Sequence, residues 1–281
     1  MKYHLYLASA MFIVGSSITA GRFIAVNTPV NLSMFLRFAV GSAALYLFML
    51  LRKERPASLS AENVFLICLQ ALLGSVLFNV FLLRGLKTVS AVASGIISGF
   101  TPVMITVLAF VLLREKADKM KIAAACTATA GIIVANTESG RLEADSAGLL
   151  FVFAAVLCES LFLIMRRLIR TNIPTVSLSL YLSIAGMFFF AFPAAKEIAP
   201  LTLKEYAVIG YYGIFITAAA YLLWLEGIKH VQASAASAYT AVMPVSAVLT
   251  SVLFLGEPLF FRHLAGLALV SAAIILTGKK R

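Results

Sequence analysis

Long apolar stretches separated by short polar connectors run along the whole chain. Ten of them are recognisable, at residues 4–26, 30–51, 63–84, 89–113, 119–137, 146–168, 175–193, 204–226, 232–255 and 260–278. Each is close to the roughly 20 residues that a helix needs to cross the hydrocarbon core of a bilayer. The pattern therefore predicts an all-α integral membrane protein with ten transmembrane helices.

The second part of the chain repeats the first. When the sequence is shifted by 142 residues, residues 85–134 align with residues 227–276 without gaps, and 13 of the 50 pairs are identical. The identical pairs include Pro102 with Pro244 and Glu115 with Glu257. Because common hydrophobicity alone does not align prolines and glutamates, we interpret the match as an internal repeat of five helices.

The boundary between the repeats falls in the most polar connector, residues 136–146. The predicted halves are residues 1–137 and residues 146–281. Since five is an odd number, the second copy enters the membrane upside down relative to the first. Inverted repeats are typical of secondary transporters, in which they form two gates around a site near the membrane midplane. The repeat therefore indicates transport by alternating access.

Charge supports the membrane assignment and suggests an orientation. Only 12% of the residues are charged, against roughly 25% in a soluble domain, so a soluble fold is excluded. Most of the 23 Lys and Arg lie in alternate connectors, among them residues 52–55, 114–121, 166–170 and 279–281. The positive-inside rule then places both termini in the cytoplasm, which predicts a multi-pass protein of the bacterial inner membrane. These residues do not cluster with aromatics on one face, so no nucleic-acid partner is expected.

Enzyme chemistry has no support in the sequence. The chain has no GxxxxGK, HExxH or GxSxG motif, and His4, His230 and His263 are far apart. We therefore expect no catalytic residue, no metal site and no cofactor, and an energy source other than ATP. A non-transporting receptor or assembly subunit stays open on motifs alone, although such a protein gains nothing from an inverted repeat.

Two segments resemble a known family. They are "LKTVSAVASGIISGFTPVMITVLAFVLLREK" and "YLLWLEGIKHVQASAASAYTAVMPVSAVLTSVLFLGEP", which are similar to the paired signatures of the EamA family of the drug/metabolite transporter superfamily. The resemblance covers essentially the whole chain. It implies a central cavity lined by helices of both halves and the export of amino acids, other metabolites or toxic compounds.

The chain departs from the family pattern at two places. Val14-Gly15 stands where a Trp-Gly pair is usual, and Arg84 stands where a small residue is common. The substrate therefore does not follow from the resemblance. We expect an exporter of a small amphipathic metabolite or drug; the alternative is a proton-coupled antiporter of cationic toxic compounds.

Two prolines mark candidate substrate-binding segments. Pro102 and Pro244 lie inside predicted helices, where proline frees the carbonyl four residues earlier, here those of Ser98 and Thr240. Interrupted helices at corresponding places in two halves point to a substrate site. Either these carbonyls bind substrate, or neighbouring hydroxyl groups satisfy them.

Charged residues inside the apolar stretches are further candidates. Glu159 falls near the middle of the sixth stretch, where a charge costs roughly 2.5–3.5 kcal/mol. It could exchange a proton, neutralise a cationic substrate or serve as a structural carboxyl. Arg37 and Arg22 are explained equally by topology and packing or by binding a substrate carboxylate. Of the two, Arg37, about two turns inside the outer end of its stretch, is the first choice and Arg22 the second as a carboxylate clamp, a role that suits the planar fork of arginine.

The remaining candidates are polar or aromatic residues on apolar helices, a combination that suits an amphipathic ligand. They are Asn79, Tyr221, Trp224 and Tyr239. Gly95 and Gly99 have small-xxx-small spacing, which predicts close packing between the halves or, as an alternative, a homodimer face. The expected partners are thus a small-molecule substrate, the lipid bilayer and, under the homodimer alternative, a second copy of the chain.

Overall fold

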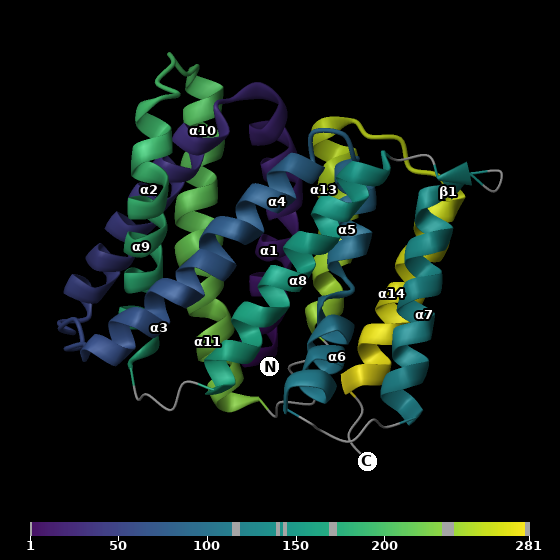
Figure 1. Ribbon diagram of the computed structural model, residues 1–281, viewed down its shortest axis with the longest axis horizontal. Coiled ribbons are helices and arrows are strands. Elements are labelled where there is room, and N and C mark those ends of the chain that lie inside the picture. Colours follow the sequence, from purple (N-terminus) through teal and green to yellow (C-terminus); the bar gives the residue numbers. More distant parts are fainter. Residues whose placement is uncertain are drawn as a thin grey trace.

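The computed structural model describes residues 2–113, 119–138, 141–142, 145–168, 173–231 and 239–278. Within these ranges the chain is helical apart from connectors and one short antiparallel pair, β1 (Thr137–Glu138) with β2 (Arg141–Leu142). The helices form one array of upright and tilted rods, and α1 begins at the end of the array where α14 ends (Figure 1). The helical fold predicted from the apolar stretches is confirmed.

The bounds of the elements follow the predicted stretches closely, apart from the start of the stretch 232–255, which lies outside the described residues. The first part of the chain forms α1 (Lys2–Asn27), α2 (Val30–Leu51), α3 (Ala61–Ala71), the π-helical segment η1 (Leu72–Leu77), α4 (Phe78–Gly85), α5 (Ala91–Ser98), α6 (Thr101–Leu113) and α7 (Lys119–Asn136). The second part forms α8 (Ser146–Leu168), α9 (Thr175–Ala195), α10 (Leu203–Tyr211), the π-helical segment η2 (Tyr212–Ala219), α11 (Ala220–His230), the 3-10 turn η3 (Tyr239–Ala241), α13 (Val242–Leu255) and α14 (Phe261–Gly278).

Several helices suit a bilayer in both length and composition. Five are long and apolar enough to cross it: Lys2–Asn27, Val30–Leu51, Ala61–Gly85, Thr175–Ala195 and Leu203–Trp224. Shorter apolar helices accompany them within the described residues. Large apolar side chains such as Leu51, Phe65 and Phe254 project from the array, as lipid-facing residues do, because hydrocarbon solvates them as well as a protein core does. The chain is therefore a multi-pass membrane protein.

Local signals explain where several helices begin. Ser60 and Ser90 each accept a hydrogen bond from the backbone N–H three residues later, so they cap α3 and α5. Thr202 and Glu205 form a reciprocal capping box at the start of α10. These caps satisfy N–H groups that have no partner inside the helix.

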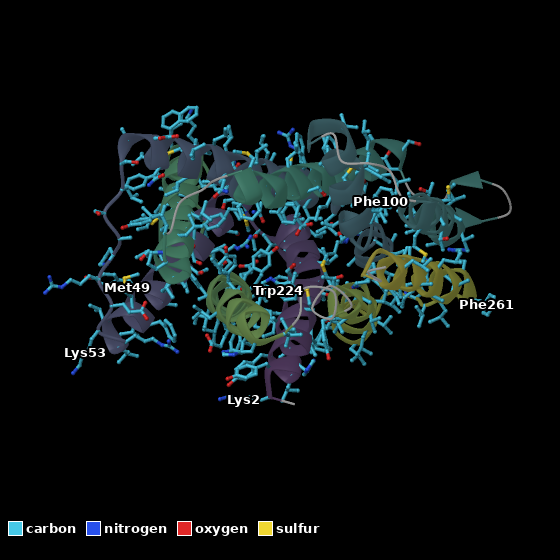
Figure 2. All side chains as sticks on the ribbon, turned by 90° about the horizontal axis from the view of Figure 1, so that it is seen from below. Lys2, Met49, Lys53, Phe100, Trp224 and Phe261 are labelled. Carbon is cyan, nitrogen blue, oxygen red and sulfur yellow. The ribbon has the colours of Figure 1, made fainter. Side chains whose placement is uncertain are left out.

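The long helices pack mainly in pairs that are far apart in sequence. α2 lies along α9, and α7 lies along α14 (Figure 1). Between these pairs, α1 packs against α11 and α13, and α8 packs against α4 and α6. Seen along the helices, the array is elongated, with Met49 of α2 and Phe261 of α14 toward opposite extremities (Figure 2).

Small residues allow α5 and α13 to approach closely. A Cβ atom on Gly95 would lie 2.5 Å from Cβ of Ala247, and one on Gly99 would lie 2.4 Å from Cγ1 of Val270 in α14 and 3.3 Å from Cγ of Pro244. Neither glycine leaves room for a side chain. The predicted packing role of Gly95 and Gly99 within the molecule is confirmed.

Pro102 and Pro244 do not lie in helix interiors, which corrects the expectation from the sequence. The stretch 89–113 is interrupted at Gly99 and Phe100, so that Pro102 is the second residue of α6, and Pro244 is the third residue of α13 after the turn η3. Proline is favoured in a first helical turn because its missing N–H would have no intrahelical partner there. Each proline thus begins a new helix instead of bending an existing one.

Candidate functional site

A buried arginine on α2 lies among neutral polar and aromatic groups. Nη1 of Arg37 donates to Oδ1 of Asn79 at 2.6 Å, and Nε donates to Oγ1 of Thr217 at 3.1 Å. The Arg37 guanidinium carbon also lies 4.0 Å from the ring centroid of Tyr212, a cation–π distance. We call these four residues, Arg37, Asn79, Tyr212 and Thr217, the Arg37 cluster.

The charge of Arg37 has no carboxylate partner within the described part of the chain. Only 8% of the residue is exposed. Burying a guanidinium without an opposite charge costs several kcal/mol, which hydrogen bonds and the Tyr212 ring offset in part. The Arg37 cluster therefore has the chemistry to attract an anionic group.

Both π-helical segments border this cluster. Tyr212 begins η2 and Thr217 lies within it, while Asn79 follows η1 by two residues. The Thr217 hydroxyl donates to the Tyr212 carbonyl at 3.2 Å, five residues earlier. π-Helical turns are rare and occur often at functional sites, because they widen the helix and re-aim its side chains.

A second cluster joins α8 to the break between α5 and α6. Oγ1 of Thr101 is 2.9 Å from Oε2 of Glu159 and 2.9 Å from the carbonyl oxygen of Ser98. Ser98 and Thr101 are buried, whereas Glu159 is partly accessible. The hydroxyl of Thr101 thus satisfies the Ser98 carbonyl and also binds the carboxyl group.

The structure brings together only some of the residues singled out from the sequence. Arg37 meets Asn79, and Glu159 meets Ser98 through Thr101. Arg22 donates to the backbone carbonyl of Leu86, so it ties the end of α1 to the end of α4.

The other candidates lie apart from these two clusters. The Tyr239 hydroxyl is 2.9 Å from Nδ1 of His4, near the start of α1. Tyr221 and Trp224 are partly exposed on α11, Thr240 is partly exposed in η3, and Pro244 is buried beside Gly99. The side chain of Pro102 lies outside the described atoms.

Thr101, Tyr212 and Thr217 were not singled out from the sequence, and neither was the buried Gln70. Gln70 on α3 is 1% exposed, and neither atom of its side-chain amide has a partner within the described residues. An unsatisfied buried amide costs roughly 1–3 kcal/mol, so it marks a place where water or a ligand would be favourable. A glutamine inside the apolar stretch 63–84 was the signal that could have identified it.

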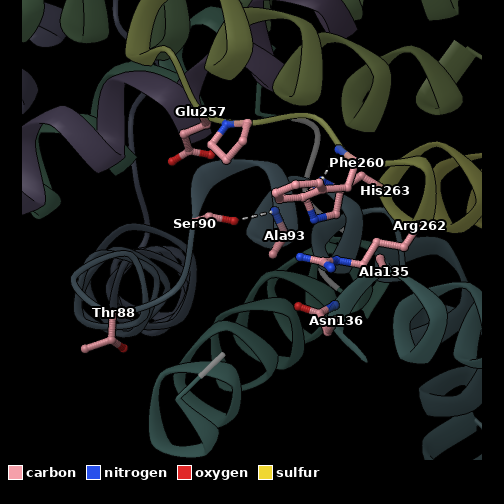
Figure 3. A pocket seen from close by; sticks show the side chains of 10 residues that line it. Thr88, Ser90, Ala93, Ala135, Asn136, Glu257, Phe260, Arg262 and His263 are labelled. Atoms are coloured by element: carbon pink, nitrogen blue, oxygen red, sulfur yellow. Dashed lines mark hydrogen bonds between the residues drawn. The ribbon is translucent and has the colours of Figure 1, made fainter. Parts of the chain in front are cut away.

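Glu257 links two distant elements at the end of the array where α13 ends. Its carboxylate oxygens accept from the backbone N–H groups of Ala91 and Val92, each at 2.8 Å. Gly256 ends α13 in the left-handed conformation, with φ 64°, and so turns the chain toward α5. Glu257, Ser90, Ala93 and His263 line a small cavity of about 190 Å³. Figure 3 shows Glu257 facing Ser90 and Ala93.

Replacing Glu257 tests whether its hydrogen bonds to α5 keep the end of the protein where α13 ends closed to water-borne reagents. In Glu257→Ala the first turn of α5 loses two charge-assisted hydrogen bonds. We expect labelling of Ala93→Cys by a membrane-impermeant maleimide to rise at least several-fold, in a background without the native cysteines.

Glu205→Ala is the matched control. Glu205 also accepts a backbone N–H at a helix start, from Thr202 at 2.6 Å, but it caps only its own helix. Equal labelling of Ala93→Cys in both variants would mean that Glu257 stabilises α5 but does not keep this end of the protein closed.

The chain matches a known family of transporters over nearly its whole length. The model of the EamA-like transporter family matches residues 1–137 and 146–279. The uncharacterized transporter YetK of Bacillus subtilis is 33% identical over 290 residues, which cover 100% of this chain and 88% of that protein. An uncharacterized transporter of Archaeoglobus fulgidus is 24% identical over 285 residues, which cover both chains completely.

A solved crystal structure shares the fold. It matches 98% of this chain and 95% of its own, with a TM-score of 0.71 and 18% sequence identity. At that identity the likeness concerns the fold alone. The family matches cover nearly the whole chain and confirm the resemblance found in the sequence: the chain belongs to the EamA-like transporter family.

Proposed function

We propose that the protein is a secondary transporter with ten membrane-spanning segments, arranged as two inverted five-helix halves, residues 1–137 and 146–281. In this proposal it exports a small amphipathic metabolite, such as an amino acid or a related compound, or a drug, by alternating access. It lies in the bacterial inner membrane with both termini in the cytoplasm, as the distribution of basic residues favours.

The observation that carries the proposal is the pattern of helix partners. We call two helices counterparts when they correspond under the 142-residue shift between the halves. The main contacts between helices recur between their counterparts. α1 packs on α11 and α13, and its counterpart α8 packs on α4 and α6, which are the counterparts of α11 and α13. The pairs α2 with α9 and α7 with α14 each join two counterparts. An inverted repeat accounts for such recurrence, and related structural halves are the usual basis of alternating access.

The backbone irregularities support the same correspondence between the halves. Under the shift of 142 residues, η1 corresponds to residues 214–219, which lie inside η2. Pro102, in the first turn of α6, likewise corresponds to Pro244, in the first turn of α13. Interrupted or widened helices at matching places in two halves are the feature expected around a transporter's binding site.

Transport itself is tested by flux. Comparing the metabolites of a strain that overexpresses the protein with those of a deletion strain selects the compounds to assay. Purified protein in liposomes is then expected to carry at least one of them at a saturable rate, while protein-free liposomes do not. Binding of these compounds without flux would instead indicate a receptor or an assembly subunit.

A further inference from the structure

A lateral crevice lies between α1, α10 and α13, and neither Glu159 nor any residue of the Arg37 cluster lines it. Its volume is about 530 Å³. Phe12 of α1 is 43% exposed and Phe254 of α13 is 78% exposed, and both line it. Because exposed phenylalanines on membrane-spanning helices contact acyl chains, the crevice opens toward the hydrocarbon of the bilayer.

The length of the crevice matches one leaflet. Along α1 its lining runs from Phe12 to Phe23, about 16 Å at the rise of an α-helix. Half of the hydrocarbon core is about 15 Å. One acyl chain, lying parallel to α1, has the length to fill the crevice.

The polar groups on the crevice wall bind one another. The Ser16 hydroxyl is 2.6 Å from the Tyr211 hydroxyl, and the Thr19 hydroxyl is 2.6 Å from that of Thr250. A ligand in the crevice therefore meets polar atoms that already have partners. Such a surface accepts an apolar chain without leaving buried groups unsatisfied.

One end of the crevice carries a positive charge. Lys204, in the first turn of α10, is exposed, and its Nζ lies 5.1 Å from the ring centroid of Phe23. It is the one charged side chain among the lining residues in the described part of the molecule. A lysine at the membrane-surface end of an acyl-chain groove has the position of a headgroup contact.

We propose that this crevice binds a phospholipid with an anionic headgroup, whose acyl chain lies against α1 and whose phosphate is held by Lys204. The site is independent of which substrate is transported. The occupant is a membrane lipid, since the mouth faces hydrocarbon and the charge sits at the level of the headgroups.

The test measures lipid retention on the purified full-length protein by native mass spectrometry, after exchange into phosphatidylglycerol or phosphatidylcholine. We expect phosphatidylglycerol to remain bound, and Lys204→Gln to lower its retention at least fivefold. Lys196→Gln is the matched control, because Lys196 is also exposed and lies 4.4 Å from the ring of Phe192, outside the crevice. Ala207→Trp fills the crevice and should lower the retention of both lipids.

Three outcomes would overturn the proposal. Equal retention by wild type and Lys204→Gln would remove the headgroup contact. Unchanged retention in Ala207→Trp would place the lipid elsewhere. If lipid-free protein gains thermal stability from indole-3-acetate but not from phosphatidylglycerol, and loses that gain in Lys204→Gln, the occupant is a small water-borne anion. Because the readout is binding, a negative flux assay leaves this result unaffected.

Discussion

Glu159→Gln is expected to abolish gradient-driven transport while leaving exchange of substrate across the membrane intact. A proton gradient of one pH unit is worth about 1.4 kcal/mol per proton, or about tenfold accumulation of substrate. Glutamine keeps the shape and hydrogen bonding of a protonated glutamate but does not titrate. The variant should therefore equilibrate substrate without concentrating it.

The contact with Thr101 gives a physical reason for a protonation-dependent step. The Thr101 hydroxyl has one hydrogen but faces two acceptors at 2.9 Å, the Ser98 carbonyl and Glu159. When Glu159 carries a proton, it donates to Thr101, and Thr101 donates to Ser98. When Glu159 is ionised, the two acceptors compete for one hydrogen, so proton loss changes how α8 is held at the break between α5 and α6.

The measurement is flux against pH in liposomes for wild type, Glu159→Gln and Thr101→Val. Thr101→Val keeps the carboxyl group and removes the hydroxyl, so its pH profile should shift and gradient-driven transport should persist in part. A structural carboxyl predicts lower abundance or melting temperature with unchanged pH dependence. A carboxylate that binds cationic substrates predicts weaker transport of cations alone. Superimposable profiles of wild type and Glu159→Gln would exclude Glu159 from the mechanism.

Arg37→Met is expected to reduce transport of anionic or zwitterionic substrates by about 10- to 100-fold. Each hydrogen bond to a charged group contributes about 1.5–3 kcal/mol. Loss of one such bond weakens binding by roughly 10- to 100-fold. Methionine fills the space of the arginine stem. It removes the cost of burying the charge and leaves Oδ1 of Asn79 without its donor, two effects of opposite sign that are each about a few kcal/mol. The melting temperature should therefore change little. Arg37→Lys should recover only part of the activity, since an ammonium does not reproduce the fork to Asn79 and Thr217.

Arg84→Met is the matched control for this prediction. Arg84 is exposed in the last turn of α4, and its guanidinium carbon lies 5.9 Å from the ring centroid of Phe151. Its loss should leave both transport and stability close to wild type. If Arg37→Met loses stability and transport in parallel, for neutral substrates as well, Arg37 has a structural role and the anion site lies elsewhere.

The bounds of the helices could be predicted from the sequence to within a few residues, for a simple reason. Inside a bilayer every backbone N–H and C=O must be satisfied within the segment, so a long apolar stretch has helix as its stable form. The π-helical segments and the break at Gly99 and Phe100 could not be predicted. They depend on side chains such as Thr217 and on neighbours that approach from distant parts of the chain.

The sequence by itself determined the membrane helices and the family, and it predicted the repeat, because apolar length and matched prolines are properties of the chain. Only the tertiary structure decided which polar residues meet. Arg37 contacts Asn79 and Thr217, which lie 42 and 180 residues away, and helices that are apolar on all sides carry no periodic signal of their inner face. For the same reason, the Glu257 contact with α5 and the crevice at Lys204 could be recognised only in the packed structure.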